Sequence, residues 1–286
     1  MDIQRFPGDV LDLLPEVRER HVPGDALYAF LKKIARSAVE ELFSSVEALP
    51  RAFGEFGDII LPYFSMGAVD SRNLFDIDEL IIFSYYLRNR KRYKRAADIG
   101  ANIGLHSILL SRCIENVRAF EPDPTHYAVL KSNLEKNGCR NVETFNCAIS
   151  SKPGEMQFVR VLGNTTGSHL AGSKSSPYGK LDRFAVQVRG ITEVIEWADF
   201  IKLDAEGHEA NIVIATSERH WEKTDAVIEV ENSKNAQILF DHFRSNKVNM
   251  FSQKTGWKRA GSLSDVPTSY KEGMLFVTHK DEMPWD

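Results

Sequence analysis

Cysteine is scarce in this chain of 286 residues, and no long apolar run is present. The three cysteines, Cys113, Cys139 and Cys147, are an odd number without CxxC or histidine spacing, so we expect neither a disulfide framework nor a zinc site. No stretch approaches the roughly 20 apolar residues that a membrane span needs. Five charged residues among the first 16 argue against a signal peptide, and we therefore expect a cytoplasmic location.

A strong excess of one charge sign is also lacking. Lysine and arginine number 36 against 40 aspartate and glutamate residues, which gives a formal net charge of −4. A nearly balanced charge without a long basic run provides no strong attraction to nucleic acid or to an anionic membrane. We therefore expect neither as a partner.

Residues 1–90 are predicted to form a helical extension ahead of a main domain at residues 91–286. Apolar residues recur at spacings of three and four between Leu27 and Leu42, and Asp25 is placed to cap that helix. A second helix is expected at residues 77–87, after a break that contains proline and glycine. We expect this extension to act as a lid or as a homodimer interface.

Short apolar runs alternate with helical stretches after residue 95. Because parallel neighbours in a sheet need crossover connections, this alternation predicts an α/β fold with a mostly parallel sheet and helices on both faces. Residues 150–190 interrupt the alternation with a polar, glycine-rich insertion, flanked by short strands at 156–161 and 184–188. The other strands are expected at residues 96–99, 117–120, 142–147, 200–203, 226–230 and 275–277, and helices at 105–113, 125–137, 209–217 and 235–245.

The segment from Asp98 to Gly104 is predicted to bind an adenosine-type ligand. The first strand runs into a turn from Gly100 through Asn102 to Gly104, where backbone N–H groups at a helix start can approach a ligand without obstruction by a Cβ. Glu121 follows at the end of the second strand, where a carboxylate can accept hydrogen bonds from two ribose hydroxyls. A glycine turn paired with an acid at the next strand end is the general signature of such a site.

The turn differs from the dinucleotide fingerprint, which would place a glycine close to a pyrophosphate. Asp98 precedes the turn, and its carboxylate would repel a pyrophosphate but suits the ammonium of an amino-acid group. S-Adenosylmethionine is therefore predicted as the cofactor in preference to NAD. Cys147 and Ala148, at the end of the third strand, are expected to bracket the adenine ring.

A further group of polar residues stands where the strand at residues 200–203 meets a helix. Asp204, Glu206, His208 and Glu209 lie in this short segment. In an open α/β sheet the ligand crevice is outside the carboxyl ends of the strands, so we expect Asp98, Glu121 and Asp204 to converge there.

Four motifs together resemble, in order and spacing, the FkbM family of S-adenosylmethionine-dependent methyltransferases. The motifs are Asp98-Ile-Gly-Ala-Asn-Ile-Gly104, Phe120-Glu-Pro122, Asn146-Cys-Ala148 and Ile201-Lys-Leu-Asp-Ala-Glu-Gly-His-Glu209. The resemblance implies a class I methyltransferase (Rossmann-like) fold, with a seven-stranded sheet whose last strand is antiparallel. It also implies methylation of a hydroxyl on a sugar or a natural product. Members often carry a Leu-Asp pair before the fourth strand, where this chain has Gly-Ile-Thr-Glu-Val at residues 190–194.

Methyl transfer to an alcohol benefits from a base that takes the hydroxyl proton. His208 is the first candidate because the unperturbed pKa of histidine is about 6.5, and Glu206 and Glu209 are alternatives. Asp204 is expected to position the methionine end of the cofactor or the acceptor, although Asp204 and Glu206 are also plausible helix caps. His169, in an insertion suited to a substrate loop or lid, is a second candidate base.

Two carboxylates on the strand after Asp204, Glu229 and Glu231, are expected to face opposite sides. Glu231 lies nearer the strand end and is the better candidate for the pocket. A magnesium ion held by Asp204, Glu231 and Asn232 is the less favoured alternative to a site without metal.

The sequence therefore predicts an S-adenosylmethionine-dependent O-methyltransferase that acts on a small hydroxylated acceptor, such as a sugar or a glycosylated or polyketide-type natural product. The main alternative is a non-catalytic nucleotide-binding or assembly module that keeps the methyltransferase fold. An NAD-dependent oxidoreductase is a third and less favoured interpretation.

Overall fold

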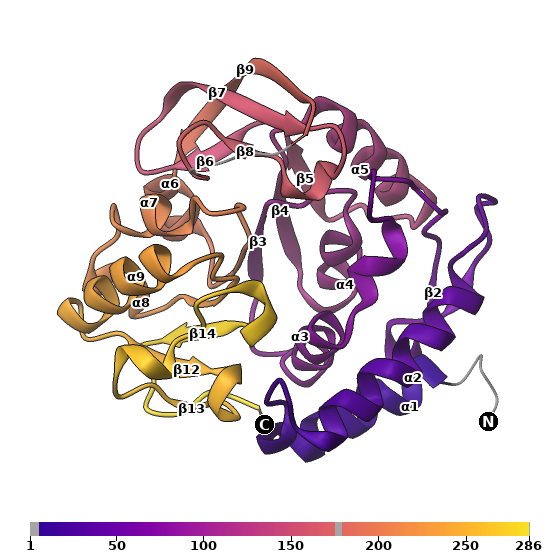
Figure 1. The fold of residues 1–286 in the computed structure, drawn as a ribbon, viewed down its shortest axis with the longest axis horizontal. Helices are drawn as coiled ribbons and strands as arrows, with labels where there is room; N and C mark the ends of the chain where they lie inside the picture. The colour runs from indigo at the N-terminus through magenta and orange to yellow at the C-terminus, as the bar shows by residue number, and fades with distance from the viewer. Residues whose placement is uncertain (1–5, 175–178, 286) are drawn as a thin grey trace.

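An eight-stranded mixed sheet lies at the centre of the structure, a computed structural model that describes residues 6–174 and 179–285 (Figure 1). In spatial order the strands are β13 (Lys258–Arg259), β12 (Asn249–Ser252), β14 (Leu275–Thr278), β11 (Asp225–Ile228), β10 (Phe200–Leu203), β3 (Arg95–Ile99), β4 (Asn116–Phe120) and β5 (Val142–Phe145). β14 is antiparallel to its neighbours β11 and β12, whereas β11, β10, β3, β4 and β5 are mutually parallel. This arrangement confirms the predicted α/β fold with an antiparallel last strand.

The sheet has eight strands rather than the seven expected, because β13 adds a two-residue edge strand beside β12. A turn through Gly256, whose φ is +70°, returns the chain from β12 to β13. The sequence pattern does not reveal either strand. β12 begins with Asn249 and ends with Ser252, residue types that seldom favour strands, and tertiary packing buries all four of its residues.

Helices cover both faces of the sheet, and each face has its own apolar core (Figure 1). The alternation of side chains along β3 serves both cores, since Ala96 faces the first and Ala97 and Ile99 face the second. Among residues 6–174 and 179–285, no helix is both long and apolar enough to cross a bilayer. The first face carries α3 (Ile77–Arg88), α4 (Leu105–Cys113) and α5 (Pro124–Lys136), and the second carries α6 (Ile191–Trp197), α7 (Glu209–Val213), α8 (Glu218–Trp221) and α9 (Ser233–Ser245).

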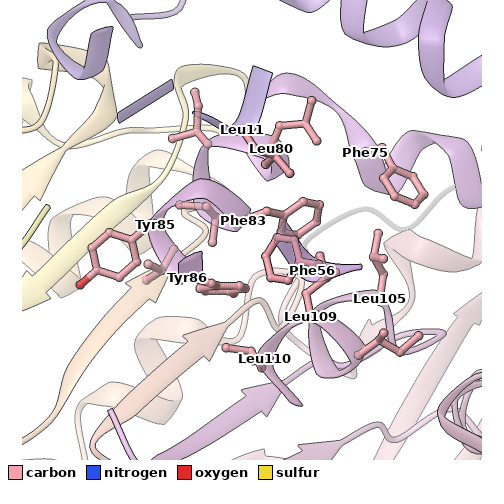
Figure 2. Close-up of a cluster of buried hydrophobic side chains, with 14 of the residues drawn as sticks. Leu11, Phe56, Phe75, Leu80, Phe83, Tyr85, Tyr86, Leu105, Leu109 and Leu110 are labelled. Atoms are coloured by element: carbon pink, nitrogen blue, oxygen red, sulfur yellow. The ribbon is translucent and has the colours of Figure 1, made fainter. Parts of the chain in front are cut away.

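The predicted helical extension packs directly against the first face of the sheet. It comprises α1 (Phe6–Leu13), α2 (Ala26–Leu42) and α3, and its first five residues lie outside the part of the chain that the structure describes. Figure 2 shows Phe83 and Tyr86 of α3 gathered with Leu109 and Leu110 of α4. The same core reaches Trp285, so the extension and the sheet share one hydrophobic interior.

Aspartate caps explain where the helices of the extension begin. Asp25 accepts a hydrogen bond from the backbone N–H of Leu27 at 2.8 Å, and Asp76 accepts one from Ile77 at 2.7 Å. The predicted cap at Asp25 and the predicted helix from residue 77 are therefore confirmed.

A second sheet of four strands lies at the top of the view in Figure 1. Its strands in spatial order are β6 (Ala148–Ser150), β9 (Leu181–Gly190), β7 (Gly154–Val161) and β8 (His169–Leu170). The long antiparallel pair of β7 and β9 confirms the two strands predicted to flank the insertion, of which residues 175–178 lie outside the described residues.

The single strand predicted at residues 142–147 is wrong beyond Phe145. Asn146 leaves the sheet, and its side-chain amide donates to the backbone carbonyl of Glu121 at 2.8 Å. The chain then enters β6 of the second sheet. The helix predicted at residues 209–217 also ends early, at Val213.

Gly100 closes the junction between β3 and β10, and we expect alanine there to destabilise the fold. Its φ is +78°, and a Cβ would lie 1.7 Å from the carbonyl oxygen of Asp204. Gly138 also has a positive φ, +63°, but a Cβ there would meet nothing within 4 Å. Gly100→Ala should lower the free energy of unfolding by about 3 kcal/mol or more, and Gly138→Ala by about 1 kcal/mol. Urea denaturation measures both losses, and equal values would contradict the steric explanation.

Candidate active site

A pocket opens at the carboxyl ends of β3, β4, β10 and β11, where an open α/β sheet places its ligands. Of the ten site residues predicted from the sequence, Asp98 and Gly104 do not line it. The other eight do: Gly100, Asn102, Glu121, Cys147, Ala148, Asp204, Glu206 and His208.

The glycine turn is held in shape by backbone hydrogen bonds to the end of β4. The N–H groups of Gly100 and Ala101 both donate to the carbonyl of Phe120 at 3.0 Å. Asn102 adopts a left-handed conformation with φ of +51°, and its N–H donates to Glu121 Oε2 at 2.8 Å. Its side-chain Oδ1 is buried and has no hydrogen-bond partner among the described residues. The turn therefore presents an unused acceptor at the pocket wall.

Glu121 is the buried acid at the end of β4. Its Oε1 accepts from the N–H of Asp123 at 2.8 Å, while Oε2 serves Asn102. Burial raises the pKa of Glu121 to about 8, and these two N–H donors only partly oppose the shift. Further donors to the carboxylate would favour its ionised form.

Lys202 stands behind the pocket between two aspartates. Its Nζ lies 3.2 Å from Asp204 Oδ2 and 3.9 Å from Asp98 Oδ1, and it donates to the carbonyl of Gly100 at 3.3 Å. Burial disfavours the ammonium, but Asp204 and Asp98 together raise the pKa of Lys202. Asp98 is fully buried and also accepts from Ser107 Oγ at 2.6 Å, which explains why it does not reach the pocket.

Glu209 shapes the loop between β10 and α7. Its Oε1 accepts from the N–H groups of Ala205 at 2.8 Å and Gly207 at 3.0 Å, and its Oε2 accepts from Asn235 on α9 at 2.5 Å. Burial raises the pKa of Glu209 to about 7. With these bonds Glu209 organises the backbone of the loop.

Glu206 forms an ion-pair cluster with a lysine from the insertion. Lys174 Nζ lies 2.5 Å from Glu206 Oε2 and 3.0 Å from Glu231 Oε1. Burial, with Asp204 as the next contributor, raises the pKa of Glu206 to about 8. Neither Asp204 nor Glu206 occupies the N-cap position of α7, because His208 does so.

His208 is hydrogen-bonded at both ring nitrogens. Its Nε2 lies 2.9 Å from Ser150 Oγ, and its Nδ1 lies 3.0 Å from Ser173 Oγ and 3.3 Å from Asn211 Nδ2. Burial lowers the pKa of His208 to about 4. The ring is therefore neutral at pH 7 and is a weak base there.

Several pocket residues carry no motif that sequence reasoning could use. Glu79, from α3, lines the pocket and lies 2.9 Å from His106 Nε2. Glu229 lines it as the first residue after β11, whereas Glu231, the candidate favoured from the sequence, pairs with Lys174. The strand ends earlier than its apolar pattern indicates, and this shift exchanges the roles of the two acids.

Two distant segments, residues 66–69 and 163–166, meet over the pocket, and we call them the roof. The N–H of Ala68 donates to the carbonyl of Gly163 at 2.7 Å, and the N–H of Thr165 donates to that of Met66 at 2.8 Å. Val69, Thr165 and Thr166 line the pocket beneath. The loop predicted to contact the substrate therefore packs against the extension. The two segments meet through backbone hydrogen bonds, which no pattern of side chains in the sequence could indicate.

The magnesium alternative weighed from the sequence is not assembled. Glu231 is paired with Lys174, and Asn232 Oδ1 accepts from the N–H of Asn235 at 3.0 Å as the cap of α9. Across residues 6–174 and 179–285, no group of three or more His, Cys, Asp or Glu side chains is placed to hold a metal ion.

Comparisons with known proteins give consistent relatives. The chain is 25% identical to "Methyltransferase sdnD" of Sordaria araneosa over 204 residues, which cover 59% of this chain and 77% of that protein. It is 22% identical to "Methyltransferase 1" of Beauveria bassiana over 160 residues, or 48% of this chain and 64% of that protein. A crystal structure of methyltransferase FkbM from Methylobacillus flagellatus aligns with a TM-score of 0.42 and 16% identity, over 94% of this chain and 58% of that one.

The model of the methyltransferase FkbM domain matches residues 98–251, more than half of the 286 residues. The matched range contains the glycine turn, Glu121 and the Asp204 loop. The resemblance inferred from the four motifs is thus confirmed, and the chain belongs to the FkbM family of S-adenosylmethionine-dependent methyltransferases.

Proposed function

We propose that this chain transfers a methyl group from S-adenosylmethionine to a hydroxyl of a small acceptor, either a sugar or a glycosylated or polyketide-type natural product. The observation that carries the proposal is the convergence of the Gly100 turn, the Glu121 carboxylate and the Asp204 loop on one pocket. Family membership supplies the reaction class, and the pocket supplies groups for both the cofactor and an acceptor.

The pocket residues fit an adenosyl group joined to an amino acid. Glu121 offers its carboxylate to ribose hydroxyls, and Asn102, whose N–H donates to that carboxylate, lines the pocket beside it. Cys147 and Ala148 are small enough to leave room for an adenine ring. We propose these four residues and Gly100 as the cofactor-binding set.

Asp98 and Gly104 belong to this proposal as supporting residues rather than as pocket lining. Asp98 lies beside Lys202, which in turn lies beside Asp204. Gly104, with φ of +92°, starts α4 and packs a Cβ-free backbone against Leu130. Both residues fix the turn that the cofactor would contact.

Bound S-adenosylmethionine supplies an electrophilic methyl group on a positively charged sulfonium. The carboxyl groups of Asp204, Glu206 and Glu229 line the pocket, and any of them that is ionised favours such a cation. Burial, reinforced by Asp204 and Glu206, raises the pKa of Glu229 well above its ordinary value, which favours the neutral carboxyl. We propose that Asp204 orients the reacting groups, because in-line transfer depends on alignment.

The extension and the insertion would enclose the acceptor. Val69 and Leu74 from the extension and Leu170 of β8 provide apolar surface, while Thr165 and Thr166 provide hydroxyl groups. A mixed lining of this kind suits a molecule with both a hydrocarbon and a hydroxylated part. We therefore propose that residues 1–90 serve as a lid for the acceptor side of the pocket.

Cofactor affinity should depend on pH through Glu121. With a pKa of about 8, this carboxyl is mostly protonated at pH 6.5 in the free protein, whereas ribose hydroxyls favour its ionised form. Binding must then release a proton, so affinity for S-adenosylhomocysteine should rise by up to about tenfold per pH unit toward pH 8 and level off above it. Calorimetry across this range measures the slope.

Two variants separate this linkage from other titrations. Glu121→Gln should flatten the slope and weaken binding at pH 8.5 by about 1–3 kcal/mol. Glu143→Gln, the same change at an exposed carboxylate on β5, should keep the wild-type curve. A wild-type slope retained by Glu121→Gln would remove Glu121 from the ribose contact.

Turnover on hydroxylated acceptors tests the reaction itself. The chain should convert S-adenosylmethionine to S-adenosylhomocysteine in the presence of some members of a panel of monosaccharides, glycosides and polyketide alcohols. Mass spectrometry and NMR should locate the new methyl group on oxygen. Amine acceptors of matched size serve as the control. Cofactor binding without turnover on any panel member would favour the non-catalytic module instead.

A further inference from the structure

We propose that His169 is the general base that takes the proton from the acceptor hydroxyl, an inference that rests on the proposed O-methyl transfer. His169 forms β8 with Leu170 and lines the same pocket as Asp204 and Glu206. The sequence favours His208 for this role. In the structure, however, both ring nitrogens of His208 are hydrogen-bonded, whereas only Nδ1 of His169 is.

β8 and the turn before it hold His169 in a fixed position. β8 pairs with β7, with His169 opposite Val159, and the N–H of Ala171 donates to the carbonyl of Gln157 at 2.8 Å. The hydroxyl of Ser168 accepts from the N–H of Val161 at 3.1 Å. Only 2% of the surface of His169 is exposed, so the ring is locked by packing as well as by the backbone.

The hydrogen bond at Nδ1 determines which nitrogen of His169 carries the proton. Nδ1 lies 3.0 Å from the carbonyl oxygen of Gly167. A carbonyl can only accept, so Nδ1 must donate, and Nε2 of the neutral ring then keeps its lone pair. Nε2 has no hydrogen-bond partner among the described residues. The atom is also not fully enclosed by its neighbours. The lone pair is therefore free to receive a proton in the pocket.

The charged groups around His169 keep the ring neutral before reaction. Burial, together with Lys174 and Arg183, lowers its pKa, while the bond to Gly167 and the charge of Glu231 oppose the shift. A neutral imidazole at physiological pH is the form that can act as a base.

The two other histidines of the pocket, His126 and His208, are both anchored through Nε2, the ring nitrogen that His169 leaves without a partner. Both ring nitrogens of His208 are hydrogen-bonded to serine hydroxyls. His126 Nε2 lies 2.9 Å from the hydroxyl of Thr165 in the roof.

The carboxylates of the pocket are also already engaged. Asp204 pairs with Lys202, Glu206 pairs with Lys174, and Glu121 accepts two backbone N–H groups. Burial and the neighbouring acids raise the pKa of Glu229 well above its ordinary value, which favours the protonated form over the form that accepts a proton. His169 Nε2, in contrast, is a ring nitrogen of the pocket wall with no hydrogen-bond partner among the described residues.

The proposed step balances in atoms and charge. His169 Nε2 takes the hydroxyl proton while the acceptor oxygen forms its bond to the methyl carbon. The carbon–sulfur bond breaks, and its electron pair stays on sulfur as a neutral thioether. One positive charge disappears from the sulfonium and one appears on the imidazolium, so the net charge of the pocket is unchanged. Glu231, which raises the pKa of His169, favours the imidazolium product.

His169→Asn is the decisive variant, because an asparagine amide can still donate to Gly167 while the Nε2 lone pair is lost. We expect turnover on the acceptor found with the panel to fall by about 10²–10⁴-fold, with affinity for S-adenosylhomocysteine unchanged within threefold. The acid limb of the wild-type rate profile, which falls below pH 6.5, should be absent from the variant. The control is His279→Asn at a half-exposed histidine outside the pocket, which should keep wild-type turnover.

Histidine NMR provides a readout that needs neither cofactor nor acceptor. In 15N-histidine-labelled protein at pH 7.5, the signals lost in His169→Asn should report a protonated Nδ1 and an unprotonated Nε2. A proton on Nε2, or turnover of His169→Asn within threefold of wild type, would overturn the assignment while leaving the proposed function in place. Failure of the wild-type chain to bind S-adenosylhomocysteine would instead defeat the proposed function itself.

Discussion

The buried ammonium of Lys202 is the interaction on which the pocket depends. It stands on β10 directly opposite Asp98 on β3, and it also contacts Asp204 and the carbonyl of Gly100. A buried cation is tolerated only with such compensation, so the two strand ends must keep the register that supplies it. The close approach of Gly100 to the Asp204 carbonyl is the steric counterpart of this electrostatic tie. The glycine turn and the Asp204 loop are thereby held as one unit.

Much of this organisation could be predicted from the sequence because it is local. The apolar run of β3, the glycine turn, the acid after β4 and the polar loop after β10 each occupy a few consecutive residues, and they meet because carboxyl ends of parallel strands share one edge. Non-local choices could not be predicted. Asp98 contacts Ser107 and Lys202 and therefore does not line the pocket. Asn146 leaves its strand and donates to the carbonyl of Glu121. In these cases the sequence shows which residue is present but not which residue it contacts in the fold.

The acids of the pocket have different tasks despite their proximity. Glu209 accepts hydrogen bonds from the loop backbone, Asp204 and Glu206 each have a lysine partner, and burial raises the pKa of Glu229. Glu121 has two N–H donors and a raised pKa, so its charge responds to what binds beside it. Burial and ion pairing thus give the carboxyl groups of the pocket different properties: some hold the backbone, some pair with lysine, and the ionisation of Glu121 depends on the donors beside it.

The roof joins the extension to the insertion through main-chain hydrogen bonds at residues 66–68 and 163–165, and the close approach requires glycine at Gly67, whose Cβ would meet the carbonyl of Gly163. Because main-chain atoms make this joint, the side chains of Val69 and Thr166, which line the pocket beneath it, are not needed to hold the two segments together. The joint between the two segments and the lining beneath it are therefore separate features of the structure. Under the proposed function, substitutions at the pocket-facing positions would change which acceptor fits while the main-chain joint of the roof stays in place.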